Sequence, residues 1–214
     1  MRDLLSVIFI AALAAAVSCQ CRADDSAYFP THKEGEKAPG LPDIYALWYG
    51  ASLRKMKEPA LWPAKPDIQV YRFLILPTWG HPMAVRTVVT EKGGKLIARR
   101  LSGQGGYSLG KLDEQREIAL SREDSTELKK RIGLLKFFEM PTEDDTSGTD
   151  GEQWILEGVA NGKYHVIHRW CASAYDPGKR GLKSFLHLCE FLVTKSGLSK
   201  RPMNRDHELL PLAK

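Results

Sequence analysis

The residues best placed for chemistry lie in a β-hairpin that the sequence predicts for residues 153–170. The Asn-Gly pair at 161–162 is typical of a two-residue type I′ turn, which requires positive φ at both positions. Such a turn fixes the strand register, and side-chain alternation then places Glu157, Tyr164 and His168 on one face. Glu157 and His168 are diagonal neighbours in this register, so a long side chain can bridge them. A carboxylate beside an imidazole can orient and polarise it, which is the start of general acid–base catalysis.

The same three residues also have a structural interpretation. Glu157 can form a hydrogen bond with His168 or Tyr164 that only stabilises the hairpin, or these side chains can face solvent. Acid–base catalysis needs a pocket and usually a third group, which the sequence does not identify. Glu157, His168 and Tyr164 are therefore candidate catalytic residues, while the sequence favours a protein that is not an enzyme.

Other catalytic and cofactor patterns are missing from the sequence. The glycine-rich stretch 103–106 lacks the strand–loop–helix context of a phosphate-binding loop, and no serine lies in a nucleophile-elbow sequence. Neither Cys171 nor Cys189 has the nearby Cys or His partners of a zinc site. The acidic residues of 143–152 do not fit the spacing of a calcium-binding loop. We therefore expect no cofactor and no metal site.

The first two dozen residues follow the layout of an export signal. Arg2 gives a positive start, residues 4–17 form an apolar run interrupted only by one serine, and small residues precede Cys19. The run is shorter than the roughly 20 apolar residues that a membrane-spanning helix needs. We expect the mature protein to be exported, either to the periplasm or as a membrane-anchored lipoprotein.

Two cleavage positions are open. The Ala-Val-Ser-Cys sequence that ends at Cys19 resembles the lipobox of bacterial lipoproteins, in which cleavage leaves a cysteine that is then diacylated. The signal would be residues 1–18 in that case, and two acyl chains are enough for stable anchoring. Ordinary cleavage after Ala23 is the alternative, with a signal of residues 1–23.

The two remaining cysteines have two possible states. Cys171 and Cys189 lie in the expected folded region, and an exported protein enters an oxidising compartment where a disulfide can form. The spacing alone cannot establish the bond, because the two Cα atoms must approach within about 7 Å. A Cys171–Cys189 disulfide and two buried thiols are both consistent with the sequence.

The hairpin is part of a longer pattern, DGxxWxLEGxxxGxYHxxxRW, which spans residues 150–170 and precedes a helix that ends near Ser196. This segment resembles one found in uncharacterised exported bacterial proteins, and the resemblance covers about a third of the chain. A Ser-Pro pair often follows the Arg-Trp in that family, whereas Cys171 and Ala172 stand here. The resemblance implies the fold of the segment and export, and it implies no reaction.

Periodicity predicts the order helix, four strands, helix, hairpin, helix. The ranges are 43–57, 68–76, 84–90, 95–101, 116–120, 121–138, 153–170 and 181–194. In the first helix, Ile44, Leu47, Trp48 and Ala51 recur at helical spacing. Short links favour antiparallel neighbours, so we predict an α+β fold with a single antiparallel sheet of about six strands and the helices packed on one face.

We expect a single folded domain at 42–198, after a flexible tether at 19–41 and before a loose tail at 199–214. The 214-residue chain carries a net charge of +5 that is spread along it. This moderate basicity fits an anionic envelope surface or envelope proteins as partners, and no nucleic-acid-binding motif is present. We therefore expect a non-catalytic binding or structural module of the cell envelope, tethered to a membrane if Cys19 is acylated. The alternative is a small periplasmic, hydrolase-like enzyme that uses the Glu157–His168 pair.

Overall fold

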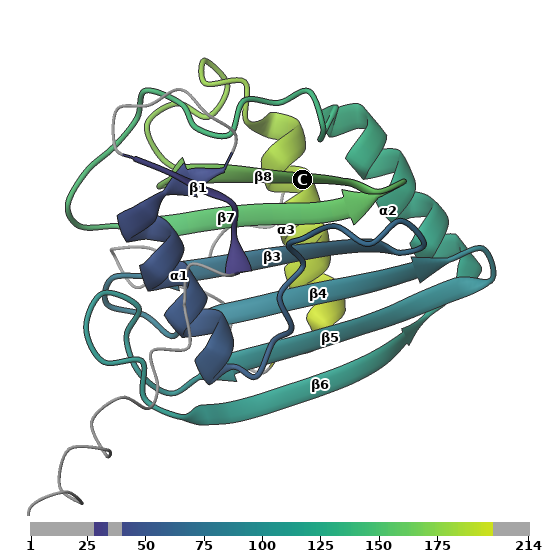
Figure 1. The fold of residues 1–214 in the computed structure, drawn as a ribbon, viewed down its shortest axis with the longest axis horizontal. Helices are drawn as coiled ribbons and strands as arrows, with labels where there is room; N and C mark the ends of the chain where they lie inside the picture. The colour runs from purple at the N-terminus through teal and green to yellow at the C-terminus, as the bar shows by residue number, and fades with distance from the viewer. Residues whose placement is uncertain (1–27, 34–39, 199–214) are drawn as a thin grey trace, which may run out of the picture.

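The computed structural model describes residues 28–33 and 40–198, and Figure 1 shows their arrangement. A six-stranded antiparallel sheet with the strand order β6-β5-β4-β3-β7-β8 forms the centre, which confirms the predicted α+β class. The elements are β1 (Thr31–His32), β2 (Leu41–Pro42), α1 (Asp43–Lys55), β3 (Gln69–Pro77), β4 (Met83–Thr90), β5 (Gly93–Leu101), β6 (Leu112–Leu120), α2 (Arg122–Leu135), β7 (Glu152–Ala160), β8 (Lys163–Trp170) and α3 (Lys183–Ser196).

The β7–β8 hairpin has the register that the sequence predicts. Ala160 pairs with Lys163 beside the turn, and Ile155 pairs with His168 near the other end. The turn at 161–162 has φ values of 51° and 70°, as a type I′ turn requires. This hairpin joins the rest of the sheet through β7, which pairs with β3.

The helices do not all lie on one face of the sheet, so that part of the prediction is wrong. Helices α2 and α3 pack together on one face, while α1 crosses the other (Figure 1). The physical reason is that the central strands are apolar on both sides. In β7 all nine residues are buried, and in β3 all but Gln69 are buried. A sheet that is apolar on both faces needs cover on both.

The expected flexible tether is also wrong where the structure describes it. Phe29 is only 2% exposed and packs edge-on against the ring of Tyr49 in α1, while Leu41 is fully buried. Strands β1 and β2 form a short parallel pair, in which Thr31 is opposite Leu41 and His32 is opposite Pro42. The folded unit therefore includes residues 28–33, because Phe29 and Leu41 complete the core under α1.

Several predictions concern parts of the chain outside the described residues. They are the export signal, Cys19, the rest of the expected tether, and the tail at 199–214. Across residues 28–33 and 40–198, no helix combines the length and the apolar content that crossing a membrane would require.

Candidate functional site

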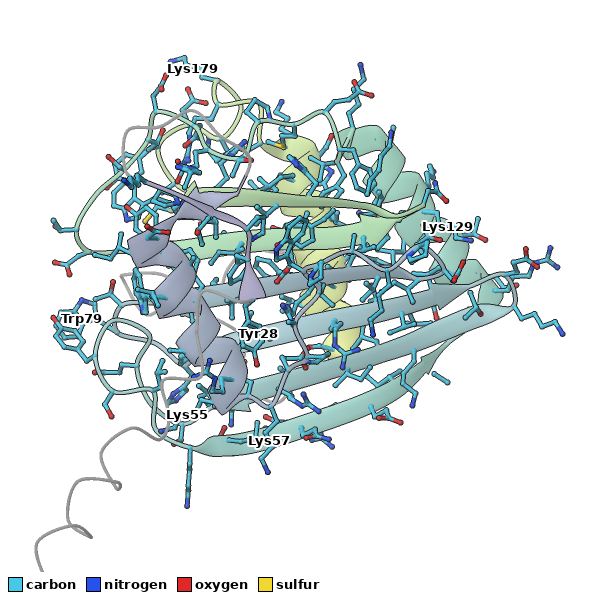
Figure 2. The ribbon with its side chains drawn as sticks, in the orientation of Figure 1. Tyr28, Lys55, Lys57, Trp79, Lys129 and Lys179 are labelled. Atoms are coloured by element: carbon cyan, nitrogen blue, oxygen red, sulfur yellow. The ribbon has the colours of Figure 1, made fainter. Side chains whose placement is uncertain are left out.

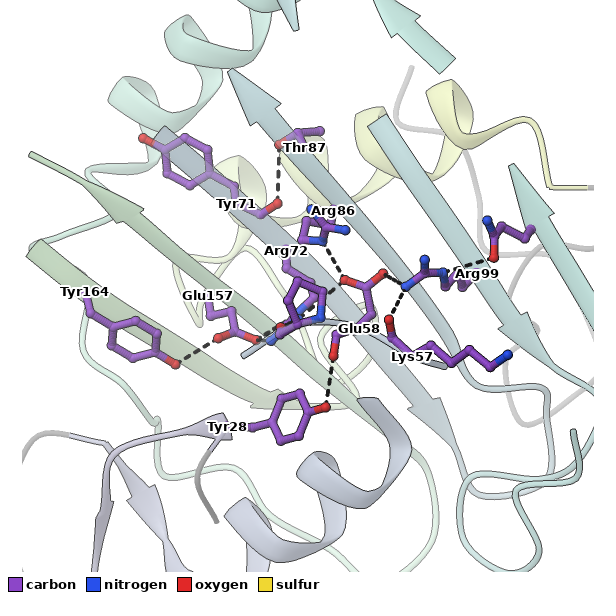
Figure 3. A network of polar contacts seen from close by, with 12 residues as sticks. Tyr28, Lys57, Glu58, Tyr71, Arg72, Arg86, Thr87, Arg99, Glu157 and Tyr164 are labelled. Carbon is purple, nitrogen blue, oxygen red and sulfur yellow. Dashed lines mark hydrogen bonds and ion pairs between the residues drawn. The ribbon is translucent and has the colours of Figure 1, made fainter. Parts of the chain in front are cut away.

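The candidate Glu157 lies in a buried ion pair at the centre of the α1 face (Figure 3). Its cross-strand partner in β3 is Arg72, and both side chains are 1% exposed or less. Arg72 donates two hydrogen bonds to Oε1 of Glu157, from Nε at 2.8 Å and from Nη2 at 2.6 Å. The Tyr164 hydroxyl donates to Oε2 at 2.9 Å. Both carboxylate oxygens are therefore occupied by neighbouring side chains.

A second buried carboxylate, Glu58, lies just beyond α1 and extends this network across the sheet. It accepts hydrogen bonds from Arg86 Nε at 2.6 Å, Arg99 Nη1 at 2.8 Å and Arg72 Nη1 at 3.4 Å. Arg72 and Arg86 are direct cross-strand neighbours, and like charges in that position destabilise a sheet. Glu58 offsets this repulsion and fixes the end of α1 to three strands.

Burial and charge act in opposite directions on the central pair. Burial raises the pKa of the Glu157 carboxyl, while the adjacent Arg72 charge opposes that rise. Burial and the Glu157 charge together hold the Tyr164 pKa well above its ordinary value. Both carboxylate oxygens accept hydrogen bonds from neighbouring side chains, and removal of one partner would leave an uncompensated buried charge. This geometry is that of a structural network.

The candidate His168 does not contact Glu157. Its Nδ1 lies 3.0 Å from Oε1 of Glu143, and its Nε2 lies 2.7 Å from Oε1 of Gln153 and 3.0 Å from the Tyr49 hydroxyl. A Glu–His pair therefore exists, but the carboxylate comes from the acidic loop instead of the hairpin. Both ring nitrogens have protein partners, and the His168 side chain is only 8% exposed.

The structure thus brings together Glu157 and Tyr164 and separates both from His168. The pairing with Glu143 could not be read from strand alternation, because that residue lies in a loop. The loop is held in place by Asp144, which accepts hydrogen bonds from Nε and Nη2 of Arg180 at 3.0 and 2.9 Å. The contact of His168 with Glu143 lowers the pKa of that carboxyl.

Cys171 and Cys189 remain thiols, so the disulfide that the sequence left open is not formed. Cys189 is fully buried on the inner side of α3, and burial raises the pKa of its thiol. Cys171 lies in the turn that follows β8, with its sulfur against Gly151. The two side chains therefore belong to different environments, one in the α3 core and one at the end of the hairpin.

A surface that the sequence did not identify lies at the end of the sheet where β3 and β5 finish. It consists of five side chains, which we call the aromatic end: Ile44, Leu47, Trp48, Trp79 and Tyr107. Trp79 is 50% exposed and Tyr107 63% exposed, and their ring centroids are 4.7 Å apart. Trp79 projects from the edge of the molecule in Figure 2. Ile44 and Leu47, on α1, are 67% and 48% exposed.

Hydrogen bonds join the loops that carry the aromatic end. The Trp48 indole donates to the Gly105 carbonyl at 3.0 Å, which ties α1 to the β5–β6 loop. The Gly105 amide donates to the Pro77 carbonyl at 3.0 Å, and the Nδ1 of His81 lies 2.9 Å from the Gly103 carbonyl oxygen. These contacts link the β5–β6 loop to the β3–β4 loop, so Trp79 and Tyr107 are presented on a supported surface.

In the sequence, the feature that indicates this surface is the row of apolar residues in α1. Ile44, Leu47 and Trp48 have helical spacing, but the residues that face the sheet are Ala46, Tyr49, Ser52 and Leu53. The helix is therefore apolar on its outer side as well as on its inner side. Exposed apolar residues that gather in one place mark an interaction surface more often than scattered ones do.

No protein-family model matches this sequence, and no curated protein matches it. Within residues 28–33 and 40–198, no group of three or more His, Cys, Asp or Glu side chains is arranged to hold a metal ion.

Proposed function

We propose that this protein is an exported, non-catalytic binding module of the cell envelope, tethered to a membrane through Cys19, and that the aromatic end is its binding surface. The observation that carries the proposal is the exposure of two contacting aromatic rings, Trp79 and Tyr107, and of two aliphatic side chains on α1. Trp and Tyr are enriched where proteins bind, since they offer large apolar contact area with a polar tip.

The distribution of charge supports the choice of this surface over a basic one. The labelled lysines in Figure 2 lie at several edges of the molecule: Lys55 and Lys57 at one, Lys129 at another and Lys179 at a third. A net charge spread in this way defines no single face for an anionic partner. The apolar side chains of the aromatic end are, by contrast, concentrated on α1 and two adjoining loops.

The hydrolase alternative has less support. It needs Glu157 and His168 to reach a substrate, but Glu157 is held by Arg72 and Tyr164, and both His168 nitrogens have protein partners. A hydrolytic activity that was lost in His168→Asn, with the melting temperature unchanged, would revive it.

The tether is tested in the native host by metabolic labelling with an alkyne-bearing fatty acid. Two variants form a matched pair, Cys19→Ser and Cys21→Ser, because the two cysteines are two positions apart. We expect the label to be lost in Cys19→Ser and kept in Cys21→Ser, with the wild-type protein in the membrane fraction. A soluble mature protein whose intact mass corresponds to a chain beginning at Asp24 would contradict the tether.

A further inference from the structure

We propose that the aromatic end is a membrane-docking face, whose side chains enter the interfacial region of a lipid bilayer and orient the domain against it. The inference rests on the proposed tether and names the partner of the same surface. Its first support is the chemistry of the side chains. Trp79 and Tyr107 combine an apolar ring with a polar tip, which suits the boundary between headgroups and acyl chains. Ile44 and Leu47 add aliphatic surface beside them.

The second support is the reach of the chain. About nine residues separate Cys19 from Tyr28, and even a fully extended chain of that length spans at most about 30 Å. An acylated Cys19 would therefore hold the described domain within that distance of the bilayer. Docking needs little further approach, because the anchor already raises the effective concentration of lipid at the domain surface.

The third support is the place where the chain enters the fold. Phe29 packs against Tyr49, whose ring centroid lies 5.3 Å from that of Trp48 in the aromatic end. The N-terminal entry point therefore packs under α1, beside the Trp48 that belongs to the aromatic end. A tether attached there joins the domain on the same helix that carries Ile44 and Leu47.

The surroundings of the aromatic end predict which lipids it would accept. Asp43 precedes Ile44 at the start of α1 and is exposed. Asp150, also exposed, precedes Gly151, whose amide and carbonyl both bond to Thr78 beside Trp79. The exposed Lys111 closes the β5–β6 loop that carries Tyr107, so charges of both signs border this end. Such a border gives no net preference for anionic headgroups, and docking through the apolar side chains should occur on zwitterionic bilayers with weak dependence on salt.

The test uses the full mature protein in phosphatidylcholine vesicles whose acyl chains carry bromine, which quenches nearby tryptophan fluorescence. Trp62 offers a matched control. It is 41% exposed and packs on Tyr164, beside the hairpin turn at the opposite end of the sheet. We expect brominated lipid to quench the wild-type protein, Trp79→Phe to lose at least about half of that quenching, and Trp62→Phe to keep it, since an interfacial Trp lies close to the acyl chains.

The outcomes separate the inference from the tether on which it rests. A membrane-bound protein whose quenching is equal in Trp79→Phe and the wild type would overturn the docking face and leave the tether standing. Loss of Trp79 accessibility to acrylamide in native envelopes, without quenching by brominated lipid, would also overturn it, because a protein or glycan would then cover the surface. Absence from the membrane fraction would refute the tether, and the soluble chain would then be tested for quenching on added vesicles.

Discussion

The buried carboxyl of Glu152 makes the stability of this fold depend on pH. Glu152 is 5% exposed at the start of β7, and its hydrogen bond is with the Trp154 indole, which donates to Oε2 at 2.7 Å. Burial raises the pKa of this carboxyl from 4.5 to about 7, and the hydrogen bond with Trp154 only partly opposes that rise. Because the folded-state pKa is the higher one, the protonated form stabilises the fold below about pH 4.5. This contribution is lost as the pH rises through 7.

The size of the effect follows from the shift. A tenfold change in proton affinity corresponds to about 1.4 kcal/mol, so a rise of the Glu152 pKa from 4.5 to about 7 lowers the unfolding free energy above pH 8 by about 3 kcal/mol. The substitution Glu152→Gln keeps an oxygen acceptor for Trp154 and removes the titration. We expect this variant to unfold at a temperature similar to the wild type at pH 4.5. At pH 8 we expect it to be more stable by up to about 3 kcal/mol, or roughly 6–12 °C for a domain of this size.

The assay is thermal and denaturant unfolding, followed by circular dichroism at several values between pH 4.5 and 8.5. The quantity that matters is the difference between variant and wild type, because other groups titrate in both. Glu117→Gln is the control, since Glu117 is an exposed carboxylate whose pKa is lowered by its hydrogen bond with Lys95. It should give no gain in stability as the pH rises. If the difference between Glu152→Gln and wild type were the same at pH 4.5 and 8, the proposed cost of ionising Glu152 would be refuted.

Three further predictions concern the core, the hairpin and the outer face of α1. Arg72→Met should lower the unfolding free energy by about 3–5 kcal/mol in urea unfolding, since it leaves the buried Glu157 carboxylate without its charge partner. The double variant Arg72→Met/Glu157→Met should recover most of that loss, and equal losses in the two variants would show that the unpaired charge is not the cause. Replacement of 161–162 by Val-Val should lower the melting temperature, because β-branched residues disfavour the positive φ of the turn; an unchanged value would contradict the role of that turn. Leu47→Ala should change the unfolding free energy by less than about 0.5 kcal/mol, whereas the buried Leu53→Ala should cost about 2–5 kcal/mol; a large loss at Leu47 would mean that its side chain is packed.

The parts of the fold that the sequence predicts correctly depend on neighbours along the chain. The 161–162 turn fixes the β7–β8 register by itself. Ser121 and Asp124 cap α2 through reciprocal hydrogen bonds at 3.0 and 3.2 Å, within one turn of helix. Helical periodicity predicts a buried stripe of Leu128, Ile132, Leu135 and Phe138; the first three are buried, whereas Phe138 lies beyond the end of α2 and is 38% exposed. These features need no knowledge of how the elements pack, because the interacting groups are already close in sequence.

The parts that the sequence misses depend on contacts between distant elements. His168 meets Glu143, which a loop brings back along β8, and Glu157 turns to Arg72, which is 85 residues away in sequence. Alternation correctly placed Glu157 and His168 on one face, but it could not tell which neighbour each would choose. That choice depends on the order β3-β7-β8, which puts an arginine directly opposite Glu157.

Helix α1 is apolar on its exposed side as well as on the side that packs against the sheet. Ile44 and Leu47 recur at helical spacing, yet α1 meets the sheet with Ala46, Tyr49 and Leu53. The fold obtains its buried stripe from that inner set, so packing does not require the outer apolar residues. Exposed apolar side chains carry a solvation cost that the fold does not explain, and Trp79 with Tyr107 carries the same cost on an adjoining loop pair. Exposed apolar side chains on two adjoining elements at one end of the sheet fit a partner that covers both, and the bilayer that we propose, reached through the proposed Cys19 tether, meets that requirement.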